Sequence, residues 1–343
     1  MIEINKPLER CKLEKVRAAT DPRYGAAPEA RSITEYIEHG IVNIDKPEGP
    51  TSHEIASWVK DILKIKKAAH TGTLDPAVTG VLPVLLGTAT KLANTFVSDK
   101  EYVCVMRLHR EVKEEKLSSV CERFVGEIYQ RPPLKSAVKR QIRRRTVHYI
   151  DIKEIAGKEV LMKVGCEAGT YIRMLCHHIG LALGVGAHMS QLRRTVSFPF
   201  DEDNLTTLQD LKDAYVLFAG EDGDGNGDGD ESLLRELIMP IEYALGHLSG
   251  IIIKDSAVDA ICHGADLGAP GISRIEEGIN IGDPLIVYTL KGEAVSKGKA
   301  MLNSKDMSIA EKGICVKTEK VIMKPGTYPK GWKSRAKAEV AER

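Results

Sequence analysis

Asp75 is the residue of this 343-residue chain whose setting most favours chemistry. It lies within the segment His70–Pro83, after a Gly-containing turn and directly before a proline, with apolar residues on both sides. Glycine supplies unusual backbone dihedrals, and Pro76 biases the residue before it away from helix. We therefore expect a carboxylate that is positioned on a stiff loop. The alternative is an Asp that only stabilises a turn.

Arg173 is the cation that could pair with the Asp75 carboxylate. The segment Gly165–Gly180 is typical of a strand, a Gly-Thr junction and a helix, with Thr170 as the expected N-cap. Arg173 would then lie in the first turn, where the helix macrodipole disfavours a cation, so a specific carboxylate partner would explain it. An arginine beside a buried Asp75 would keep that carboxylate ionised and oriented. A surface salt bridge is the alternative.

A basic segment, residues 131–145, contains no acidic residue. Such a run can follow a phosphate backbone, and its affinity would fall steeply with salt because neutralised phosphates release counterions. A solvated flexible loop is the alternative, although Pro132, Pro133 and Ser136 restrict the shape of the segment. The candidate nucleic-acid contacts are Arg131, Lys135, Lys139, Arg140, Arg143, Arg144 and Arg145.

The composition limits the class of protein. The net charge of +1 conceals local patches of both signs, and the seven cysteines include no CxxC pair. With no secretory signal near Met1, this cysteine pattern predicts thiols in a reducing cytoplasm rather than disulfides. The longest apolar runs end well short of the roughly 18 to 20 residues that a membrane span needs. His177 and His178, near Cys166 and Cys176, match no usual zinc spacing.

An acidic, Gly-rich segment, residues 221–231, lies between two helix-like stretches, residues 205–218 and 232–245. It partly matches a calcium-binding loop, but the twelfth position, where a bidentate Glu is needed, is Leu233. A mobile, solvated loop is favoured, because strong charge and repeated glycine resist ordering. No metal site is therefore predicted.

Ordered motifs between residues 40 and 195 resemble those of TruB-like pseudouridine synthases, which isomerise uridine within RNA. The matching segments are Gly40–His53, His70–Pro83, Lys100–Arg107, Gln130–Lys139, Gly169–Arg173 and Gly186–Thr195. The resemblance implies that Asp75 is catalytic, that Arg173 pairs with it, and that the basic segment clasps the substrate RNA. It also implies that Tyr102 stacks on the target base, although Tyr102 shares a strand face with Cys104 and Met106, which favours core packing equally.

The chemistry implied by this resemblance needs neither metal nor cofactor. The N1 glycosidic bond of uridine is cleaved, and the base is turned and rejoined through C5. Asp75 would be the nucleophile, at the ribose or at the base ring, and the sequence leaves both open. The target nucleotide must first be extruded from any stack. Leu192 would help to wall the pocket, and His70 would help to hold the place or the backbone of the flipped nucleotide.

The regions outside these motifs resemble one branch of the family. After residue 250, period-two stretches near residues 284–290, 294–301 and 313–318 predict a small β-barrel, and a phrase beginning at His263 resembles a PUA domain, an RNA-binding module. The 39 residues before Gly40 resemble the extension of the archaeal and eukaryotic, dyskerin-like branch, which works in H/ACA ribonucleoproteins. The implied partners are an H/ACA guide RNA, substrate rRNA or tRNA, a small zinc-binding protein, a Gly/Arg-type β-barrel protein and a kink-turn-binding protein.

We therefore predict an α+β catalytic domain with a mixed, mostly antiparallel sheet, joined to a PUA barrel. The expected division is an N-terminal extension (1–39) packed on the PUA domain, a catalytic domain (40–249), the PUA domain (250–330) and a tail (331–343). The expected function is a cytoplasmic, archaeal-type, H/ACA-guided pseudouridine synthase with no membrane partner. The alternatives are a guide-independent tRNA pseudouridine-55 synthase and a non-catalytic RNA-binding scaffold.

Overall fold

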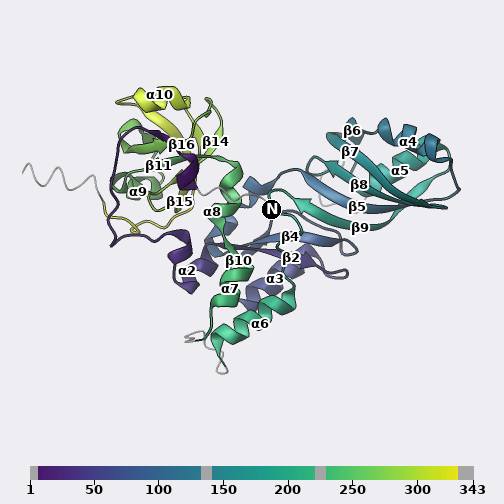
Figure 1. Ribbon diagram of the computed structural model, residues 1–343, viewed down its shortest axis with the longest axis horizontal. Coiled ribbons are helices and arrows are strands. Elements are labelled where there is room, and N and C mark those ends of the chain that lie inside the picture. Colours follow the sequence, from purple (N-terminus) through teal and green to yellow (C-terminus); the bar gives the residue numbers. More distant parts are fainter. Residues whose placement is uncertain (1–6, 133–140, 221–228, 331–343) are drawn as a thin grey trace, which may run out of the picture.

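The computed structural model describes residues 7–132, 141–220 and 229–330, and it forms an elongated molecule (Figure 1). A strand-rich body carries the larger sheet, and a smaller curled sheet forms a second body beside it (Figure 1). The expected α+β class, with a mixed and mostly antiparallel central sheet and a separate small β domain, is confirmed.

The larger sheet positions the candidate site. Its strands are β2 (Gly40–Lys46), β3 (Ala68–His70), β4 (Thr79–Leu86), β5 (Lys100–Leu108), β6 (Gly126–Gln130), β7 (Arg143–Ala156), β8 (Glu159–Cys166), β9 (Ala187–Ser197) and β10 (Ile238–Pro240). Over the described ranges their order is β10-β2-β4-β9-β5-β8-β7-β6, with β3 paired to β4. The pairing of β4 with β9 is parallel, and it brings the strand after Asp75 against the strand that carries Leu192.

Helices cover this sheet and fix its loops. They are α3 (Ser52–Ile62), α4 (Glu114–Glu122), α5 (Ile172–Leu183), α6 (Leu208–Ala219), α7 (Ser232–Leu237), α8 (Ile241–Ala244) and the 3-10 segments η2 (Gly87–Phe96) and η3 (Leu245–His247). Helix α3 begins with a capping box in which Thr51 and Glu54 satisfy each other's backbone N–H groups. The prediction of a single helix over residues 232–245 is wrong. The chain leaves the helix to pair Ile238 with Val42 at the sheet edge.

The second sheet forms the smaller body. Its elements are β11 (Ser249–Ile253), α9 (Asp255–Cys262), β12 (Leu267–Gly268), η4 (Ala269–Gly271), β13 (Ile272–Ile275), β14 (Pro284–Tyr288), β15 (Ala294–Ala300), α10 (Ser304–Ile309) and β16 (Ile314–Val321). The three strands expected from period-two patterning correspond to β14, β15 and β16. Buried side chains from these strands and from α9 form a core of their own, separate from that of the larger sheet.

The N-terminal segment runs along the smaller body. Its elements are α1 (Pro7–Arg10), β1 (Leu13–Glu14), η1 (Pro28–Ala30) and α2 (Ile33–Glu38). Strand β1 extends the smaller sheet by pairing with β13. Lys15 donates from Nζ to the Met307 carbonyl oxygen over 2.6 Å, and Lys291 donates to the carbonyl oxygen of Gly25 over 3.0 Å. These contacts tie the segment to the smaller body at two points along its length.

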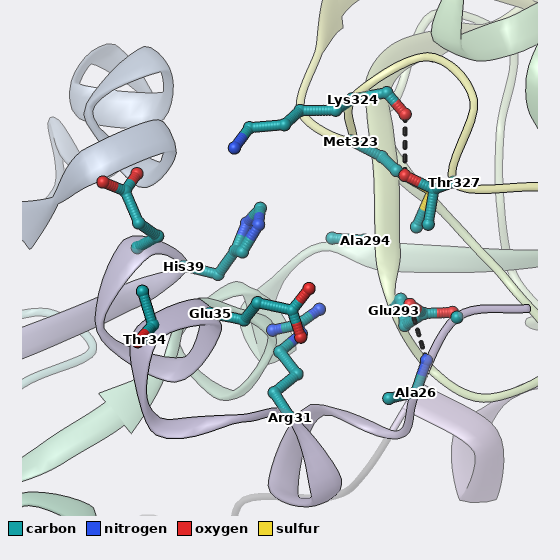
Figure 2. A pocket seen from close by; sticks show the side chains of 12 residues that line it. Ala26, Arg31, Thr34, Glu35, His39, Glu293, Ala294, Met323, Lys324 and Thr327 are labelled. Carbon is teal, nitrogen blue, oxygen red and sulfur yellow. Dashed lines mark hydrogen bonds between the residues drawn. The ribbon is translucent and has the colours of Figure 1, made fainter. Parts of the chain in front are cut away.

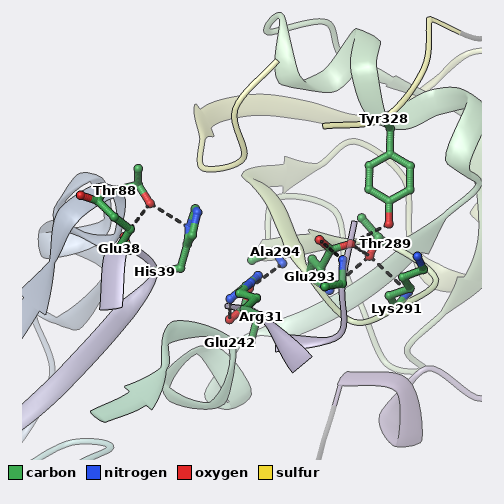
Figure 3. A network of polar contacts seen from close by, with 11 residues as sticks. Arg31, Glu38, His39, Thr88, Glu242, Thr289, Lys291, Glu293, Ala294 and Tyr328 are labelled. Carbon is green, nitrogen blue, oxygen red and sulfur yellow. Dashed lines mark hydrogen bonds and ion pairs between the residues drawn. The ribbon is translucent and has the colours of Figure 1, made fainter. Parts of the chain in front are cut away.

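A buried polar network joins the N-terminal segment to both bodies (Figure 3). Arg31 donates two hydrogen bonds to Glu242, over 3.0 and 2.7 Å, and Glu242 also accepts one from the backbone N–H of Ala294 over 3.0 Å. Nearby, the Nδ1 atom of His39 lies 2.8 Å from the Thr88 hydroxyl. Apolar residues of both bodies also pack together in one shared cluster. The two bodies are therefore packed against each other.

A cavity of about 370 Å³ opens between α2 and the smaller body (Figure 2). Arg31, Glu35, His39, Glu293 and Lys324 are among its lining residues, so charges of both signs face it. No residue predicted to act in the site lines this cavity, which belongs to the junction of the N-terminal segment. Among the described residues, no helix is both long and apolar enough to cross a membrane.

Candidate active site

The loop that carries Asp75, residues 71–78, connects β3 to β4 and is held by buried polar groups. The Ser52 hydroxyl accepts a hydrogen bond from the Leu74 N–H over 2.8 Å and donates one to the Leu74 carbonyl oxygen over 3.1 Å. Lys46 is fully buried, and its Nζ donates to the carbonyl oxygen of Pro76 over 3.0 Å. Backbone atoms on both sides of Asp75 are therefore fixed in place.

Asp75 and Arg173 meet at the surface of the larger body. Arg173 Nη2 lies 2.7 Å from Asp75 Oδ2, so the contact inferred from the sequence is present. The expected burial of the carboxylate is wrong, because the Asp75 side chain is 54% exposed and that of Arg173 is 49% exposed. The loop is anchored through its backbone, which leaves the side chain of Asp75 facing solvent. The carboxylate is accessible to a substrate without any rearrangement of the fold.

The N-cap of α5 differs from the expectation, although Arg173 still lies in its first turn. Tyr171, not Thr170, is the N-cap residue, and the Thr170 hydroxyl donates to the carbonyl oxygen of Glu167 over 2.7 Å. The side-chain amide of Gln130 binds both backbone groups of Tyr171. Its Nε2 donates to the Tyr171 carbonyl over 3.1 Å, and its Oε1 accepts from the Tyr171 N–H over 2.9 Å. Gln130 thus fixes the helix end that carries Arg173.

Tyr102 lies on β5 with 9% of its surface exposed, packed into the core of the larger body. Its partner across the sheet is Arg194 on β9, whose positive charge acts on the Tyr102 hydroxyl. Burial raises the pKa of Tyr102, and this effect outweighs the opposite effect of Arg194. The hydroxyl is therefore protonated at neutral pH. Leu192 is half-buried and pairs with Cys104, two residues further along the same two strands.

His70 ends β3, just before the Asp75 loop. Its ring packs edge-on against that of His53, with 4.7 Å between the ring centroids. Burial lowers the pKa of His70 to about 4, and His53 and Arg194 act in the same direction. The imidazole is therefore neutral at physiological pH, so His70 can offer a substrate packing or a neutral hydrogen bond but no charge.

Only part of the basic segment belongs to the described residues. Lys135, Lys139 and Arg140 lie outside them. Arg131 is exposed and Arg143 is half-buried. The last two arginines have carboxylate partners that the sequence did not indicate. Arg144 Nη1 lies 2.9 Å from Glu127, and Arg145 Nη1 lies 3.4 Å from Glu167. These two cations are therefore partly neutralised by the protein itself. Residues 222–228 of the calcium-loop candidate also lie outside the described residues.

Three buried polar residues that support the site are not among those singled out from the sequence. Lys46 and Gln130 fix the backbone beside Asp75 and Arg173, and Arg194 contacts Tyr102. Arg194 had a sequence signal. It lies two residues after Leu192 on a strand with period-two patterning, so a charge falls on an inward-facing position.

Comparison with known proteins covers nearly the whole chain. Residues 60–172 match the TruB family pseudouridylate synthase N-terminal domain, and residues 173–246 match the tRNA pseudouridylate synthase B C-terminal domain. Residues 250–322 match the PUA domain, and residues 9–56 match the DKCLD domain. The probable tRNA pseudouridine synthase B of Methanopyrus kandleri is 55% identical over 325 residues, which cover 94% of each chain. This chain belongs to the TruB family of pseudouridylate synthases.

Further relatives agree with the family assignment. The probable tRNA pseudouridine synthase B of Methanocaldococcus jannaschii is 51% identical, with 97% of each chain covered. A solved H/ACA RNP bound to a substrate RNA containing 2′-deoxyuridine matches with a TM-score of 0.83 and 51% identity, over 93% of this chain and 96% of that chain. A Cbf5-Nop10-Gar1 complex matches with a TM-score of 0.83 and 51% identity, over 96% and 99%. This TruB-family chain is a pseudouridine synthase with a PUA domain, as the motifs predicted.

Proposed function

We propose that this chain isomerises uridine to pseudouridine in RNA as the catalytic subunit of an H/ACA guide ribonucleoprotein, with Asp75 as the catalytic nucleophile. The observation that carries the proposal is the accessible Asp75 carboxylate, 2.7 Å from Arg173, on a loop whose backbone is fixed from within. Arg173 donates to Asp75 and sets the direction of the carboxylate. A fixed carboxylate with one open side is suited to covalent capture of a ribose or base carbon.

The reaction needs no co-reactant. The N1–C1′ bond of uridine breaks and a C5–C1′ bond forms, while the proton lost from C5 is balanced by the proton gained at N1. Capture by Asp75 divides this rearrangement into two steps, and expulsion of the carboxylate restores the enzyme. Neither a metal ion nor a cofactor has a role in this balance.

The remaining predicted residues receive roles around that centre. Tyr102 stacks on the extruded base, which has lost its neighbours in the RNA. Leu192 walls the pocket, and neutral His70 holds the place or backbone of the flipped nucleotide. The basic segment follows the phosphate backbone, mainly through those cations that lack a carboxylate partner in the protein. Its candidate RNA contacts are Arg131, Lys135, Lys139, Arg140, Arg143, Arg144 and Arg145.

Similarity over the entire chain supports assignment to the guided branch. The matches to an H/ACA RNP and to a Cbf5-Nop10-Gar1 complex extend over the N-terminal segment and the smaller body, beyond the synthase core. We propose the same class of partners here: a guide RNA, rRNA or tRNA substrate, Nop10-like and Gar1-like proteins, and a kink-turn-binding protein. We also propose a cytoplasmic location and a division into residues 1–39, 40–249, 250–330 and 331–343.

A guide-independent activity on tRNA is the second candidate, favoured by the names of the relatives, which are probable tRNA pseudouridine synthases B. The decisive experiment measures pseudouridine formation by the complete chain on one target RNA and on one tRNA, with and without a complementary H/ACA guide and its proteins. Turnover of the target RNA only with the guide is the expected result. Equal turnover of tRNA without any guide supports the second candidate, and no turnover under any condition contradicts both.

A further inference from the structure

Arg194 is a buried charge beneath the candidate site. Only 1% of its surface is exposed, and it is among the largest fully buried side chains of the described residues. Its Nε donates to the carbonyl oxygen of Val81 over 2.7 Å, and its Nη2 donates to the carbonyl oxygen of Gly72 over 3.2 Å. Tyr102 lies opposite it as its register partner across the β5–β9 pair. Its three partners are thus the start of the Asp75 loop, the strand after that loop, and the predicted stacking residue.

The neighbouring arginine shows how unusual these partners are. Arg193 is half-exposed and lies within 3.0 Å of Asp45 and 2.6 Å of Glu202. Within the described part of the chain, no carboxylate lies at ion-pair distance from Arg194. Burying a guanidinium without a counterion is costly, and a fold that needed only packing at this position could use an apolar side chain. This energetic cost indicates that the hydrogen bonds donated by Arg194 are needed to hold its partners in place.

The backbone is built to bring these partners to one point. Gly80 on β4 pairs in parallel with Arg194, while Tyr102 on β5 pairs with Arg194 from the other side. Gly80 has a φ of +100°, and a Cβ there would lie 2.2 Å from the Arg194 carbonyl oxygen. Only glycine allows so close an approach of the two strands. Arg194 is therefore centred between the strand that follows the Asp75 loop and the strand that carries Tyr102.

We propose that Arg194 is a positioning residue that holds the Tyr102 side chain, and with it the hydroxyl, in place against the Asp75 loop and the strand that follows it. The inference rests on the proposed roles of Asp75 and Tyr102. Because the guanidinium is fixed by the Gly72 and Val81 carbonyl oxygens and pairs with Tyr102 across the sheet, the Tyr102 ring is held at a fixed distance from the loop. The planar guanidinium can donate to both carbonyl oxygens at once while it faces Tyr102, which the single ammonium group of lysine cannot do with the same geometry.

The test compares Arg194→Lys and Arg194→Met with Arg193→Lys in the complete chain, assembled with guide RNA and partner proteins. Single-turnover pseudouridine formation and substrate RNA affinity are measured for each. A misplacement of about 1 Å can cost about 100-fold in rate, so we expect Arg194→Lys to lower the rate 10- to 100-fold without loss of RNA affinity. Arg193→Lys should retain the normal rate. If Arg194→Met does not fold, the charge-conserving Arg194→Lys decides the test.

A second arm separates positioning of Tyr102 from a general effect on the fold. Arg194→Lys is measured again in a Tyr102→Phe background, where the hydroxyl it positions is absent. The rate loss caused by Arg194→Lys should then be smaller by a factor of about three or more, since residues that act through one another are not additive. Equal losses in both backgrounds, or a normal rate in Arg194→Lys, would overturn the inference. Asp75→Asn, measured in parallel, tests the proposed function separately, because full turnover in that variant would contradict the role of Asp75 whatever Arg194 does.

Discussion

Two arginine–carboxylate pairs in this chain have the same contact distance but opposite surroundings. The closest atoms are 2.7 Å apart both in the pair of Arg31 with Glu242 and in the pair of Arg173 with Asp75. The side chains of the first pair are 8% and 1% exposed, whereas those of the second are 49% and 54% exposed. Burial, rather than contact distance, distinguishes a pair that joins parts of the fold from a pair that is available for chemistry.

The energetic consequences of the two pairs differ accordingly. A buried pair is tolerated only when hydrogen bonds satisfy its remaining polar atoms, and Glu242 achieves this with two bonds from Arg31 and one from Ala294. An exposed pair contributes only about 0–1 kcal/mol to stability. Stability therefore gives little reason for Arg173 to hold Asp75. Orientation of an accessible carboxylate is a better explanation of that contact.

The largest expected effect comes from breaking the buried pair. Glu242→Gln leaves the buried Arg31 guanidinium without its ion-pair partner, which should lower the free energy of unfolding by about 3–5 kcal/mol. Chemical denaturation of the isolated protein measures this loss. Turnover per folded molecule should stay normal, since Glu242 lies in the junction network and not beside Asp75 (Figure 3). A loss of turnover in fully folded protein would contradict the view that the buried pair serves only the fold and the exposed pair serves the reaction.

A pH effect should appear at the same junction. His39 lies near Arg31 (Figure 2), and burial, assisted by that guanidinium, lowers its pKa from 6.5 to about 4. The unfolded chain therefore binds a proton more readily than the folded chain, so stability is lost as the pH falls from 6.5 towards 4, by at most about 3 kcal/mol from this residue.

The contribution of His39 is isolated by subtraction, because other buried histidines titrate in the same range. Denaturation curves of wild type and His39→Gln are compared between pH 7 and pH 4. The stability of His39→Gln relative to wild type should increase as the pH falls. A difference that is independent of pH would show that His39 does not carry this effect.

Breaking the exposed pair should have the opposite outcome to Glu242→Gln. Arg173→Met removes the group that orients Asp75, and we expect turnover to fall by about 10- to 100-fold, or about 1.4–2.7 kcal/mol in activation free energy. The stability should change by less than about 0.5 kcal/mol, as for other exposed positions. Single-turnover assays and denaturation of the same preparation test both parts. A normal rate would show that the contact with Asp75 has no role in catalysis.

The smallest expected loss of turnover comes from substituting Gln130, the buried residue that holds the helix end beside the exposed pair. Gln130 is 1% exposed and binds the backbone of Tyr171, two residues before Arg173. Gln130→Ala should cost about 1–2 kcal/mol of stability and lower turnover by about tenfold, through looser placement of Arg173. Gln130→Glu keeps one acceptor for the Tyr171 N–H and should retain more of the rate. Equal rates in both variants would exclude this indirect role.

The sequence was informative where local rules determine the structure. Glycine and proline around Asp75 predicted a fixed loop, and the helix start at residues 169–173 placed Arg173 in a first turn. Period-two patterning predicted β14, β15 and β16. In each case the structural constraint lies within a few residues of the feature that it explains, so it is visible in one segment of the chain.

The failures concern features that depend on distant neighbours. The exposure of Asp75 depends on how the whole loop sits on the body, and Arg144 and Arg145 acquire carboxylate partners from β6 and from the loop after β8. The stretch expected as one helix over residues 232–245 is divided because β2 offers a pairing edge. The role of Arg194 depends on three partners from separate strands and loops. Pattern within one segment cannot supply such contacts.

The rate of pseudouridine formation by Asp75→Asn is the most direct test of the central claim. The substitution preserves the size of the side chain and can still accept a hydrogen bond from Arg173, so folding and RNA affinity should be retained. In a guide-assembled complex, single turnover should fall by about 10⁴-fold or more, as expected when a nucleophile is removed. Turnover within about tenfold of wild type, with normal RNA binding, would contradict the assignment of Asp75 as the catalytic nucleophile.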